Sequence, residues 1–328
     1  MLKNYLNVRY SLRNISDVDF ENILPQLASE LEQVSFIPHF EDKVLKNDWT
    51  KLCAWQSNSN TISSTNRVGL KLCEHFFPNF YDIEMKGKTY RQFWKKENLE
   101  KVLRWNRKSH STPYLSELKR GVYFCLGLTK NTMYRPQMAK LICDTYKPQL
   151  VLDPCAGWGG RMLGVVASGA HYYAFEPNTT TYDNLVKLSK FLGIEDKVTL
   201  ICDDALQMDK YSIPKVDLML TSPPYFNLEV YCKEETQSVT NYGNYQDWSQ
   251  FFFKELIRLC TYKLTKDGHS CWNVGRTGAW TMFTDLENYH KEFGYNPVNE
   301  FDVVSSKRQA INKTGKDKSQ DTTVILKA

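Results

Sequence analysis

The sequence has few of the features that mark a specialised class of protein. No apolar run in its 328 residues approaches the ~18 that a membrane-spanning helix needs, and its beginning lacks the apolar core of a signal peptide. Its nine cysteines are odd in number and never spaced C-x-x-C, and its six histidines are dispersed. These absences argue against a disulfide framework and a zinc site. We therefore expect no metal, no membrane, and free thiols inside a cell (cytoplasm, nucleus or viral factory, according to source).

Glycine is scarce in the first part of the chain, where only four of the sixteen glycines precede residue 145. Residues 1–128 carry many aromatic side chains without a recognisable motif, and we expect a mainly helical N-terminal lobe there. Residues 129–328 are expected to form a second domain, in which short apolar runs alternate with stretches of helical period. These runs lie at 149–153, 171–176, 197–202, 216–221 and 269–275.

Strands that alternate with helices predict a parallel sheet covered on both faces. The last two apolar runs, 299–304 and 322–327, have no helix between them, so we expect an antiparallel hairpin at one edge of the sheet. The predicted fold class is α/β, with a Rossmann-like sheet that ends in this hairpin.

The strongest local pattern begins at Val151 and reads VLDPCAGWGGRMLG. A buried strand ends in Asp153, and Gly157, Gly159 and Gly160 then turn the chain into a helix. Glycine at such places lets the backbone approach a ligand closely. No Lys-Ser or Lys-Thr pair follows, so the pattern is not that of a phosphate-binding loop. A tight turn that serves only the fold is the alternative.

Acidic residues also end the next two strands, Glu176 the second and Asp203-Asp204 the third. A carboxylate at the tip of the second strand is placed to accept hydrogen bonds from both hydroxyls of a ribose. The acids of the third strand are within reach of an adenine amino group. The turn is not GxGxxG, and Asp153 would repel a pyrophosphate. A sulfonium cation that carries an ammonium group fits better, which favours S-adenosylmethionine over a dinucleotide.

The fourth strand ends in Thr221-Ser222-Pro223-Pro224-Tyr225. Two consecutive prolines fix φ and remove two N–H donors, which leaves the carbonyls of Ser222 and Pro223 free to accept hydrogen bonds. Rigid acceptors beside an aromatic ring suit a planar group that bears an exocyclic amine. We therefore expect the catalytic residues to be Ser222, Pro223, Pro224 and Tyr225. The ring of Tyr225 would stack on the planar group that bears the amine, such as a nucleic-acid base. A structural proline turn is the alternative.

In its glycine-rich and proline motifs the sequence resembles the S-adenosylmethionine-dependent DNA methyltransferases that modify base amino groups. Their (D/N/S)PP(Y/F/W) motif after the fourth strand reads SPPY at 222–225, and their D/E-P-x-x-G-x-G-type motif after the first reads DPCAGWGG at 153–160. The resemblance covers roughly residues 129–328. It includes the segment 127–142, GLTKNTMYRPQMAKLI, which is similar to the motif that precedes the cofactor loop in that family.

The resemblance implies S-adenosylmethionine as the cofactor. Asp153 would hold its ammonium group, Glu176 its ribose and Asp204 its adenine, and Thr132, Tyr134 and Arg135 would surround its methionine end. The expected cofactor-binding residues are Thr132, Tyr134, Arg135, Asp153, Cys155, Ala156, Gly157, Gly159, Glu176, Pro177, Asp203 and Asp204.

The resemblance also implies duplex DNA as the partner, with RNA as an alternative. The interval between the two motifs leaves no room for a recognition domain, so we expect the N-terminal lobe (1–128) or the loops after Tyr225 to bind DNA and recognise the target. Serine in the motif is commoner among cytosine-N4 enzymes than among adenine-N6 enzymes, so N4 is favoured. The base would be flipped from the duplex, stacked on Tyr225 and Phe226, and methylated by direct in-line transfer. The polar segment 226–245 would fold over this base or form a solvated loop. An RNA base, a protein amide and a catalytically silent nucleic-acid-binding subunit are the alternatives.

Positive charge is concentrated in two segments. Residues 86–108 hold nine Lys and Arg against two acids, interleaved with four aromatic residues, and 305–318 form a second basic stretch. Such segments suit contacts with phosphates. The alternative for 86–108 is an amphipathic helix whose aromatic side chains face the core of the lobe. The expected phosphate contacts are Lys95, Lys96, Arg104, Arg107, Lys108, Lys307 and Arg308.

Overall fold

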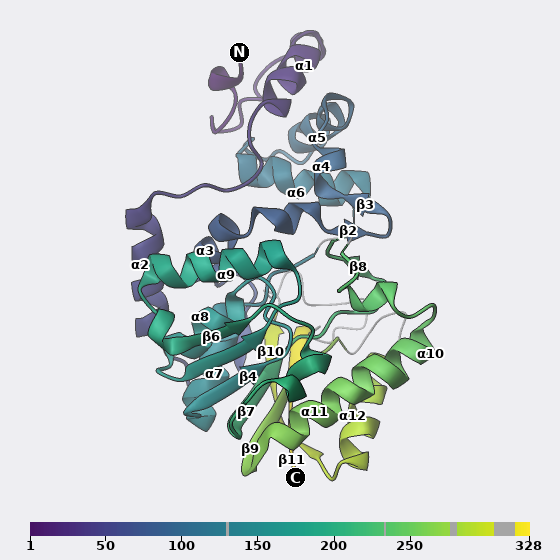
Figure 1. The fold of residues 1–328 in the computed structure, drawn as a ribbon. Coiled ribbons are helices and arrows are strands. Elements are labelled where there is room, and N and C mark those ends of the chain that lie inside the picture. The colour runs from purple at the N-terminus through teal and green to yellow at the C-terminus, as the bar shows by residue number, and fades with distance from the viewer. Residues whose placement is uncertain (129–130, 233, 276–280, 305–318) are drawn as a thin grey trace. The chain divides into compact units, whose positions relative to one another are not determined.

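A computed structural model describes residues 1–128, 131–232, 234–275, 281–304 and 319–328, with the backbone alone for 319–321. The chain forms two compact units (Figure 1). The first comprises Met1–Pro38, Pro78–Thr132 and Leu228–Cys232, and the second comprises His39–Phe77, Met133–Asn227 and Lys233–Ala328. Each unit has its own elements and core.

The second unit is built on a sheet of eight strands in the order β1-β10-β11-β9-β7-β4-β5-β6. The strands β4, β5, β6, β7 and β9 run parallel, whereas β11 is antiparallel to both of its neighbours, β9 and β10. The strands are β1 (Thr61–Ser63), β4 (Leu150–Asp153), β5 (His171–Phe175), β6 (Val198–Ile201), β7 (Val216–Thr221), β9 (Leu264–Asn273), β10 (Asn296–Val304) and β11 (Ser319–Lys327). The predicted α/β fold class, with its parallel sheet and antiparallel C-terminal strands, is confirmed.

Helices cover both faces of this sheet, which requires the strands to be apolar on both sides. Val151 and Leu218 contribute to one core, and their neighbours Leu152 and Met219 contribute to the other. The helices of the first face are α2 (Asp42–Ala54), α3 (Leu70–Phe76), α7 (Pro136–Tyr146), α8 (Gly160–Ala167) and α9 (Thr179–Leu192). The other face carries η4 (Ala205–Lys210), α10 (Tyr245–Asp247), the π-helical η6 (Trp248–Phe253), α11 (Lys254–Lys263) and α12 (Met282–Glu292).

Local sequence sets where the helices that flank the site begin and end. Pro136 occupies the first turn of α7, where its missing N–H costs nothing. The side chain of Asn178 caps α9 by accepting the N–H of Thr181 at 2.7 Å, and Gly193 ends that helix in the left-handed conformation. The start of α7 fixes where the segment before β4 becomes helical, and the start of α9 fixes where the loop after β5 ends.

The division of the chain differs from the predicted boundary at 128/129. Residues 39–77 belong to the second unit, because β1 pairs in parallel with β10 and α2 and α3 bury Leu45, Leu52 and Leu72 in the core of that unit. The strand β1 therefore lies outside the predicted hairpin, at the edge of the sheet. No sequence motif marks this segment, and its pairing partner follows about 240 residues later.

The first unit is mainly helical, as predicted. Its helices are η1 (Leu2–Asn4), α1 (Asp17–Glu32), η2 (Pro78–Asp82), α4 (Tyr90–Phe93), α5 (Lys96–Lys108) and α6 (Leu115–Leu126). A small sheet orders its strands as β3 (Lys88–Thr89), β2 (Glu84–Met85) and β8 (Glu229–Val230). The strand β8 comes from the polar segment 226–245, so part of that segment is a paired strand.

Candidate active site at the ends of the parallel strands

The carboxyl ends of five parallel strands lie at one edge of the sheet. Asp153 at the end of β4 pairs with Ala174, Phe175 at the end of β5 pairs with Ile201, and Thr221 at the end of β7 pairs with Trp272. The side chains that follow these ends therefore converge. In open α/β sheets this edge is where ligands bind.

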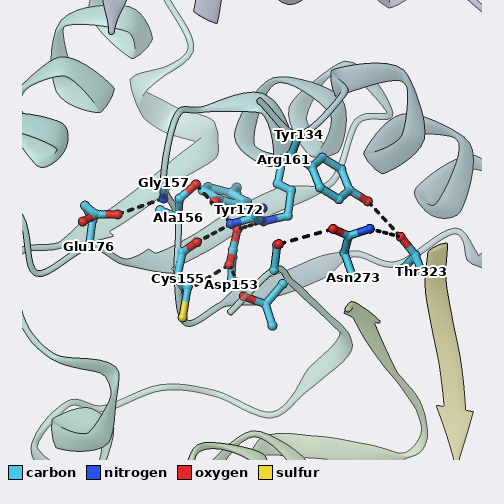
Figure 2. Close-up of polar contacts among 12 residues, drawn as sticks. Tyr134, Asp153, Cys155, Ala156, Gly157, Arg161, Tyr172, Glu176, Asn273 and Thr323 are labelled. Carbon is cyan, nitrogen blue, oxygen red and sulfur yellow. Dashed lines mark hydrogen bonds and ion pairs between the residues drawn. The ribbon is translucent and has the colours of Figure 1, made fainter. Parts of the chain in front are cut away.

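Asp153 is fully buried, and both of its carboxylate oxygens accept hydrogen bonds (Figure 2). Oδ2 accepts from Nε of Arg161 and from the hydroxyl of Tyr172, each at 2.6 Å. Oδ1 accepts from the hydroxyl of Thr221 at 2.8 Å and from the N–H of Cys155 at 3.1 Å. The expectation that Asp153 holds an ammonium group is not supported, because Arg161 already neutralises its charge.

Arg161 braces the loop after β4 from within. Its guanidinium bonds the carboxylate of Asp153 and donates to the carbonyls of Cys155 and Ala156. It also lies over the ring of Tyr134, 5.1 Å from the ring centroid. Carbonyls of the loop are thus drawn inward, toward the buried cation.

The glycines of this loop have different structural roles. A Cβ on Gly159 would lie 3.0 Å from the ring of Phe77, and one on Gly160 would overlap the carbonyl of Tyr134, so both serve close packing. Gly157 has φ +57°, and a Cβ there would meet nothing nearer than the Cys155 carbonyl at 3.8 Å. Of the three, Gly157 is therefore the position where a ligand has room to approach the backbone.

Glu176 follows β5 and is 8% exposed. Its Oε2 accepts the N–H of Gly157 at 2.8 Å, and its Oε1 accepts the N–H of Asn178 at 3.0 Å. Burial raises the pKa of this carboxyl to about 7, against the two N–H groups, which lower it. Pro177 lies between Glu176 and the residue that caps α9.

Asp203 and Asp204 follow β6 as predicted, and each has a structural partner. Asp203 accepts the hydroxyl of Tyr211 at 2.7 Å, and Asp204 caps η4 by accepting the N–H of Leu206 at 2.9 Å. Burial raises the pKa of Asp204. Both acids remain at the edge of the sheet that carries Glu176.

The SPPY motif directly follows β7 and is held at both ends by residues at or just after the end of β9. The hydroxyl of Ser222 donates to Oδ1 of Asn273 at 3.3 Å, and the N–H of Gly275 donates to the hydroxyl of Tyr225 at 2.8 Å. Pro223 is buried, whereas Ser222, Pro224 and Tyr225 are half-buried. The serine oxygen and the tyrosine ring are thus fixed relative to the sheet.

Phe226 is a correction. Its ring is only 5% exposed and packs at 6.0 Å from Tyr245 and 5.9 Å from Trp248, with a backbone φ of +48°. The predicted stacking of a base on this ring is therefore wrong, because the core of the unit covers it. The left-handed backbone at Phe226 turns the side chain inward directly after Tyr225.

The residues of the segment before β4 that the resemblance assigned to the cofactor have partners within the protein. Arg135 donates to the carbonyls of Asn66 and Ser64 at 2.6 and 2.7 Å, which ties this segment to the loop after β1. Tyr134 lies under Arg161, and its hydroxyl lies 3.5 Å from that of Thr323. Thr132 belongs to the first unit.

In the first unit, the basic helix α5 is amphipathic, with Leu99, Val102, Leu103 and Asn106 buried at helical spacing. Two of the predicted phosphate contacts have partners within the unit. Arg104 pairs with Glu21 at 2.8 Å, and Arg107 donates to the carbonyls of Leu12 and Ile15 and to Asp17. These arginines hold α1 and the segment before it against α5.

The predicted phosphate contacts also include lysines at the two ends of α5 and residues of the segment 305–318. Lys95 lies 3.3 Å from Glu32, whereas Lys96 and Lys108 have no ion pair among the residues that the structure describes. The segment 86–108 is not one helix: Tyr90 and Trp94 are buried in and after α4, and Trp105 on α5 is half-buried. Lys307 and Arg308, in the segment 305–318, lie outside the described residues.

Sequence reasoning missed four side chains of the site: Arg161, Tyr172, Thr221 and Asn273. Arg161 stands inside the quoted glycine motif, and a lone cation after a strand-ending Asp is a signal for a buried pair. Tyr172, Thr221 and Asn273 carry no such signal, because only strand pairing brings them to the motif residues.

Metal-binding clusters, membrane-spanning helices and disulfide bonds are absent from the described parts of the chain. Within them, no group of three His, Cys, Asp or Glu side chains is arranged to hold a metal ion. None of the helices described is long and apolar enough to cross a membrane. All nine cysteines are free thiols, and burial raises the pKa of Cys155.

Comparison of the sequence with family models gives one partial match. A family model described as RNA cap guanine-N2 methyltransferase matches residues 148–263, about a third of the chain. This interval runs from β4 to the end of α11 and contains the glycine loop, Glu176 and the SPPY motif. No curated protein matches the sequence.

Solved structures with a similar fold are distant in sequence. TrmN from Thermus thermophilus is 14% identical with a TM-score of 0.41, and the match covers 58% of this chain and 48% of that one. An rRNA methylase from Streptococcus thermophilus is 14% identical, with a TM-score of 0.38 and coverage of 60% and 98%. A SAM-dependent O-methyltransferase from Thermotoga maritima is 11% identical, with a TM-score of 0.40 and coverage of 62% and 69%.

At these TM-scores the structural likeness carries no functional argument, so the fold assignment rests on the strand order. That order and the family-model match support an S-adenosylmethionine-dependent methyltransferase, with S-adenosylmethionine as its cofactor.

Proposed function

We propose that the protein transfers a methyl group from S-adenosylmethionine to the exocyclic amine of a nucleic-acid base. The observation that carries this proposal is the SPPY motif, which follows β7 with Ser222 and Tyr225 both hydrogen-bonded to residues at or after the end of β9. A rigid hydroxyl, proline carbonyls and an oriented ring suit a planar amine that has to be held in line with a methyl donor.

The residues at the ends of β4 and β5 fit the cofactor. Gly157 has open space where a side chain would be, and the carboxylate of Glu176 is buried beside it. Each oxygen of Glu176 accepts one N–H, so each retains a lone pair for a ribose hydroxyl. We propose that Asp153 acts through Arg161 and the loop shape, whereas Asp203 and Asp204 face the adenine.

The bound cofactor supplies an electrophilic methyl group on a sulfonium. The residues of this chain position the nucleophile: Ser222 and the Pro223 carbonyl accept the two amine N–H bonds, which directs the nitrogen lone pair toward the methyl group. Tyr225 stacks on the base. The amine is the nucleophile, so the site needs orientation rather than a catalytic cysteine, and Cys155 and Cys232 are dispensable to the chemistry.

The first candidate substrate is duplex DNA, with cytosine N4 favoured over adenine N6, because SPPY is the form of the motif that the resemblance associates with cytosine. The base would be flipped out of the duplex to reach Ser222. The second candidate is an RNA base amine, which the match of residues 148–263 to an RNA guanine-N2 methyltransferase family favours. Both candidates present the same chemical group to the motif.

The test uses the purified protein, labelled S-adenosylmethionine, and unmodified duplex DNA and structured RNA in parallel, followed by mass spectrometry of the digested nucleosides. We expect N4-methylcytosine or N6-methyladenine in DNA. N2-methylguanine or another amine-methylated nucleoside in RNA would retain the site assignments and establish the second candidate. Cofactor binding without methyl transfer to either polymer would refute the proposed function.

Two variants test the assignment within the same assay. Replacement of Ser222 or Tyr225 by Ala should lower the transfer rate by about 100-fold or more, since the energy of correct positioning is lost. Cofactor affinity should stay within about twofold, because neither side chain belongs to the loop around Gly157. Normal turnover by Tyr225→Ala would contradict the role of the motif.

A further inference from the structure

The side chain of Asn273 connects the SPPY motif to the neighbouring strand β11. Asn273 is the last residue of β9 and is buried. Its amide nitrogen donates to the carbonyl of Thr322 at 3.2 Å and to the hydroxyl of Thr323 at 3.4 Å. Its amide oxygen accepts the hydroxyl of Ser222 at 3.3 Å (Figure 2).

The orientation of this amide follows from its partners. A backbone carbonyl can only accept a hydrogen bond, so the nitrogen of Asn273 has to face Thr322. The amide oxygen then faces Ser222, and an amide oxygen also can only accept. The hydroxyl hydrogen of Ser222 is thereby committed to Asn273.

A serine hydroxyl has one hydrogen to donate and two lone pairs. Without the bond to Asn273, the Ser222 hydroxyl could equally well accept a hydrogen bond from an amine or donate one to a carbonyl. We propose that Asn273 is a specificity-determining residue that makes Ser222 an acceptor toward the substrate. The site then selects a base with an amino group and rejects its keto counterpart, in which an oxygen replaces that amine. This inference rests on the proposed function, because it places the reacting amine at Ser222.

The link to Ser222 is not needed to pair the strands. The backbones of β9 and β11 already pair over Asn273 and its three preceding residues, with Asn273 opposite Thr323. The side-chain bond is therefore additional to the pairing of the strands. It also involves no ionisable group, so the preference for an amine should not change with pH.

The test compares binding of two oligonucleotides that differ only at the target base. One carries the base that the protein methylates, and the other carries its keto counterpart: uracil for cytosine, hypoxanthine for adenine or xanthine for guanine. The proteins are the full-length wild type, Asn273→Leu, Ser222→Ala and the double variant. Leucine has the same branch point as asparagine but is bulkier, and it neither accepts nor donates a hydrogen bond, so thermal unfolding has to show that Asn273→Leu folds. Thermal unfolding and cofactor affinity are measured for each protein.

We expect the wild type to bind the amine about tenfold more tightly than the keto base, since a mismatched polar pair leaves a buried group unsatisfied. In Asn273→Leu the Ser222 hydrogen is released and can be donated to a keto oxygen. The ratio of the affinity for the amine base to the affinity for the keto base should therefore fall toward one. In the Ser222→Ala background, the Asn273 replacement should leave the ratio unchanged.

An affinity ratio in Asn273→Leu equal to that of the wild type would overturn the inference. This includes an equal loss of affinity for both bases, which is what a purely structural role of Asn273 produces. The proposed function fails separately: a wild type that methylates no base amine refutes it and this inference with it. A wild type that methylates normally, with an unchanged ratio in the variant, refutes only the role of Asn273.

Discussion

The backbone N–H of Gly157 lies 2.8 Å from Oε2 of Glu176, which joins the loop after β4 to the end of β5. The same two residues are the ones that best fit a cofactor, one through open space beside its backbone and the other through its buried carboxylate. A ligand that approaches Gly157 therefore meets Glu176 directly.

The carboxyl of Glu176 predicts opposite effects of pH on stability and on cofactor binding. Its pKa is about 7 in the folded protein against 4.5 ordinarily, so the folded state retains a proton that the unfolded state loses. Stability should fall as pH rises from about 4.5 to about 7, by on the order of 3 kcal/mol, and then level off. Denaturant unfolding at several pH values measures this change, and Glu176→Gln should flatten the profile.

Cofactor affinity should rise over the same interval, because ribose hydroxyls donate to the ionised carboxylate and oppose its protonation. Calorimetry at pH 6 and pH 8 should show tighter binding at the higher value, with proton release at the lower one. The exposed Glu195→Gln serves as the control and should leave both trends intact. Equal affinity at the two pH values would contradict the ribose role of Glu176.

Two neighbouring glycines should respond differently to alanine. Gly160→Ala places a Cβ onto the carbonyl of Tyr134, so it should destabilise the protein by several kcal/mol, about 3 or more, or prevent folding. Gly157→Ala meets no such obstacle, and its positive φ should cost about 1 kcal/mol.

The folded Gly157→Ala protein should nevertheless bind S-adenosylmethionine at least tenfold more weakly, because its methyl group occupies the space beside the backbone. Thermal unfolding and cofactor titration distinguish the two effects. Unimpaired cofactor binding by Gly157→Ala would place the cofactor elsewhere.

The buried pair of Asp153 and Arg161 should behave as one unit. Arg161→Met leaves the carboxylate without its cation, so we expect a loss of about 3–5 kcal/mol in the free energy of unfolding. Combining Arg161→Met with Asp153→Asn removes both charges and should cost less than the sum of the single replacements. Chemical denaturation of the four proteins gives the coupling energy, and additive losses would contradict the pairing.

The strands, the antiparallel ending and the convergence of the strand tips could be predicted from the sequence, because apolar runs and glycine turns are local signals. The partners of the acids could not. Asp153 looked like a free carboxylate because the hydroxyls of Tyr172 and Thr221 reach it only through strand pairing. The position of 39–77 was missed for the same reason, since β1 joins a strand about 240 residues away.

The basic helix α5 carries cations with internal partners and cations that are exposed, and replacing one of each kind distinguishes their roles. Arg107 donates to the carbonyls of Leu12 and Ile15 and lies over the ring of Phe20, 4.8 Å from its centroid. Arg107→Gln should therefore destabilise the protein by about 1–3 kcal/mol. Lys108 is exposed at the end of the same helix, so Lys108→Gln should leave stability within about 0.5 kcal/mol.

If Lys108 contacts phosphate, its replacement should weaken nucleic-acid binding severalfold at low salt and reduce the slope of log affinity against log salt by about one. Fluorescence anisotropy with a labelled duplex at four salt concentrations measures both quantities. The same titration of Lys96→Gln tests the opposite end of α5. An unchanged slope in both lysine variants would remove Lys96 and Lys108 from the nucleic-acid interface.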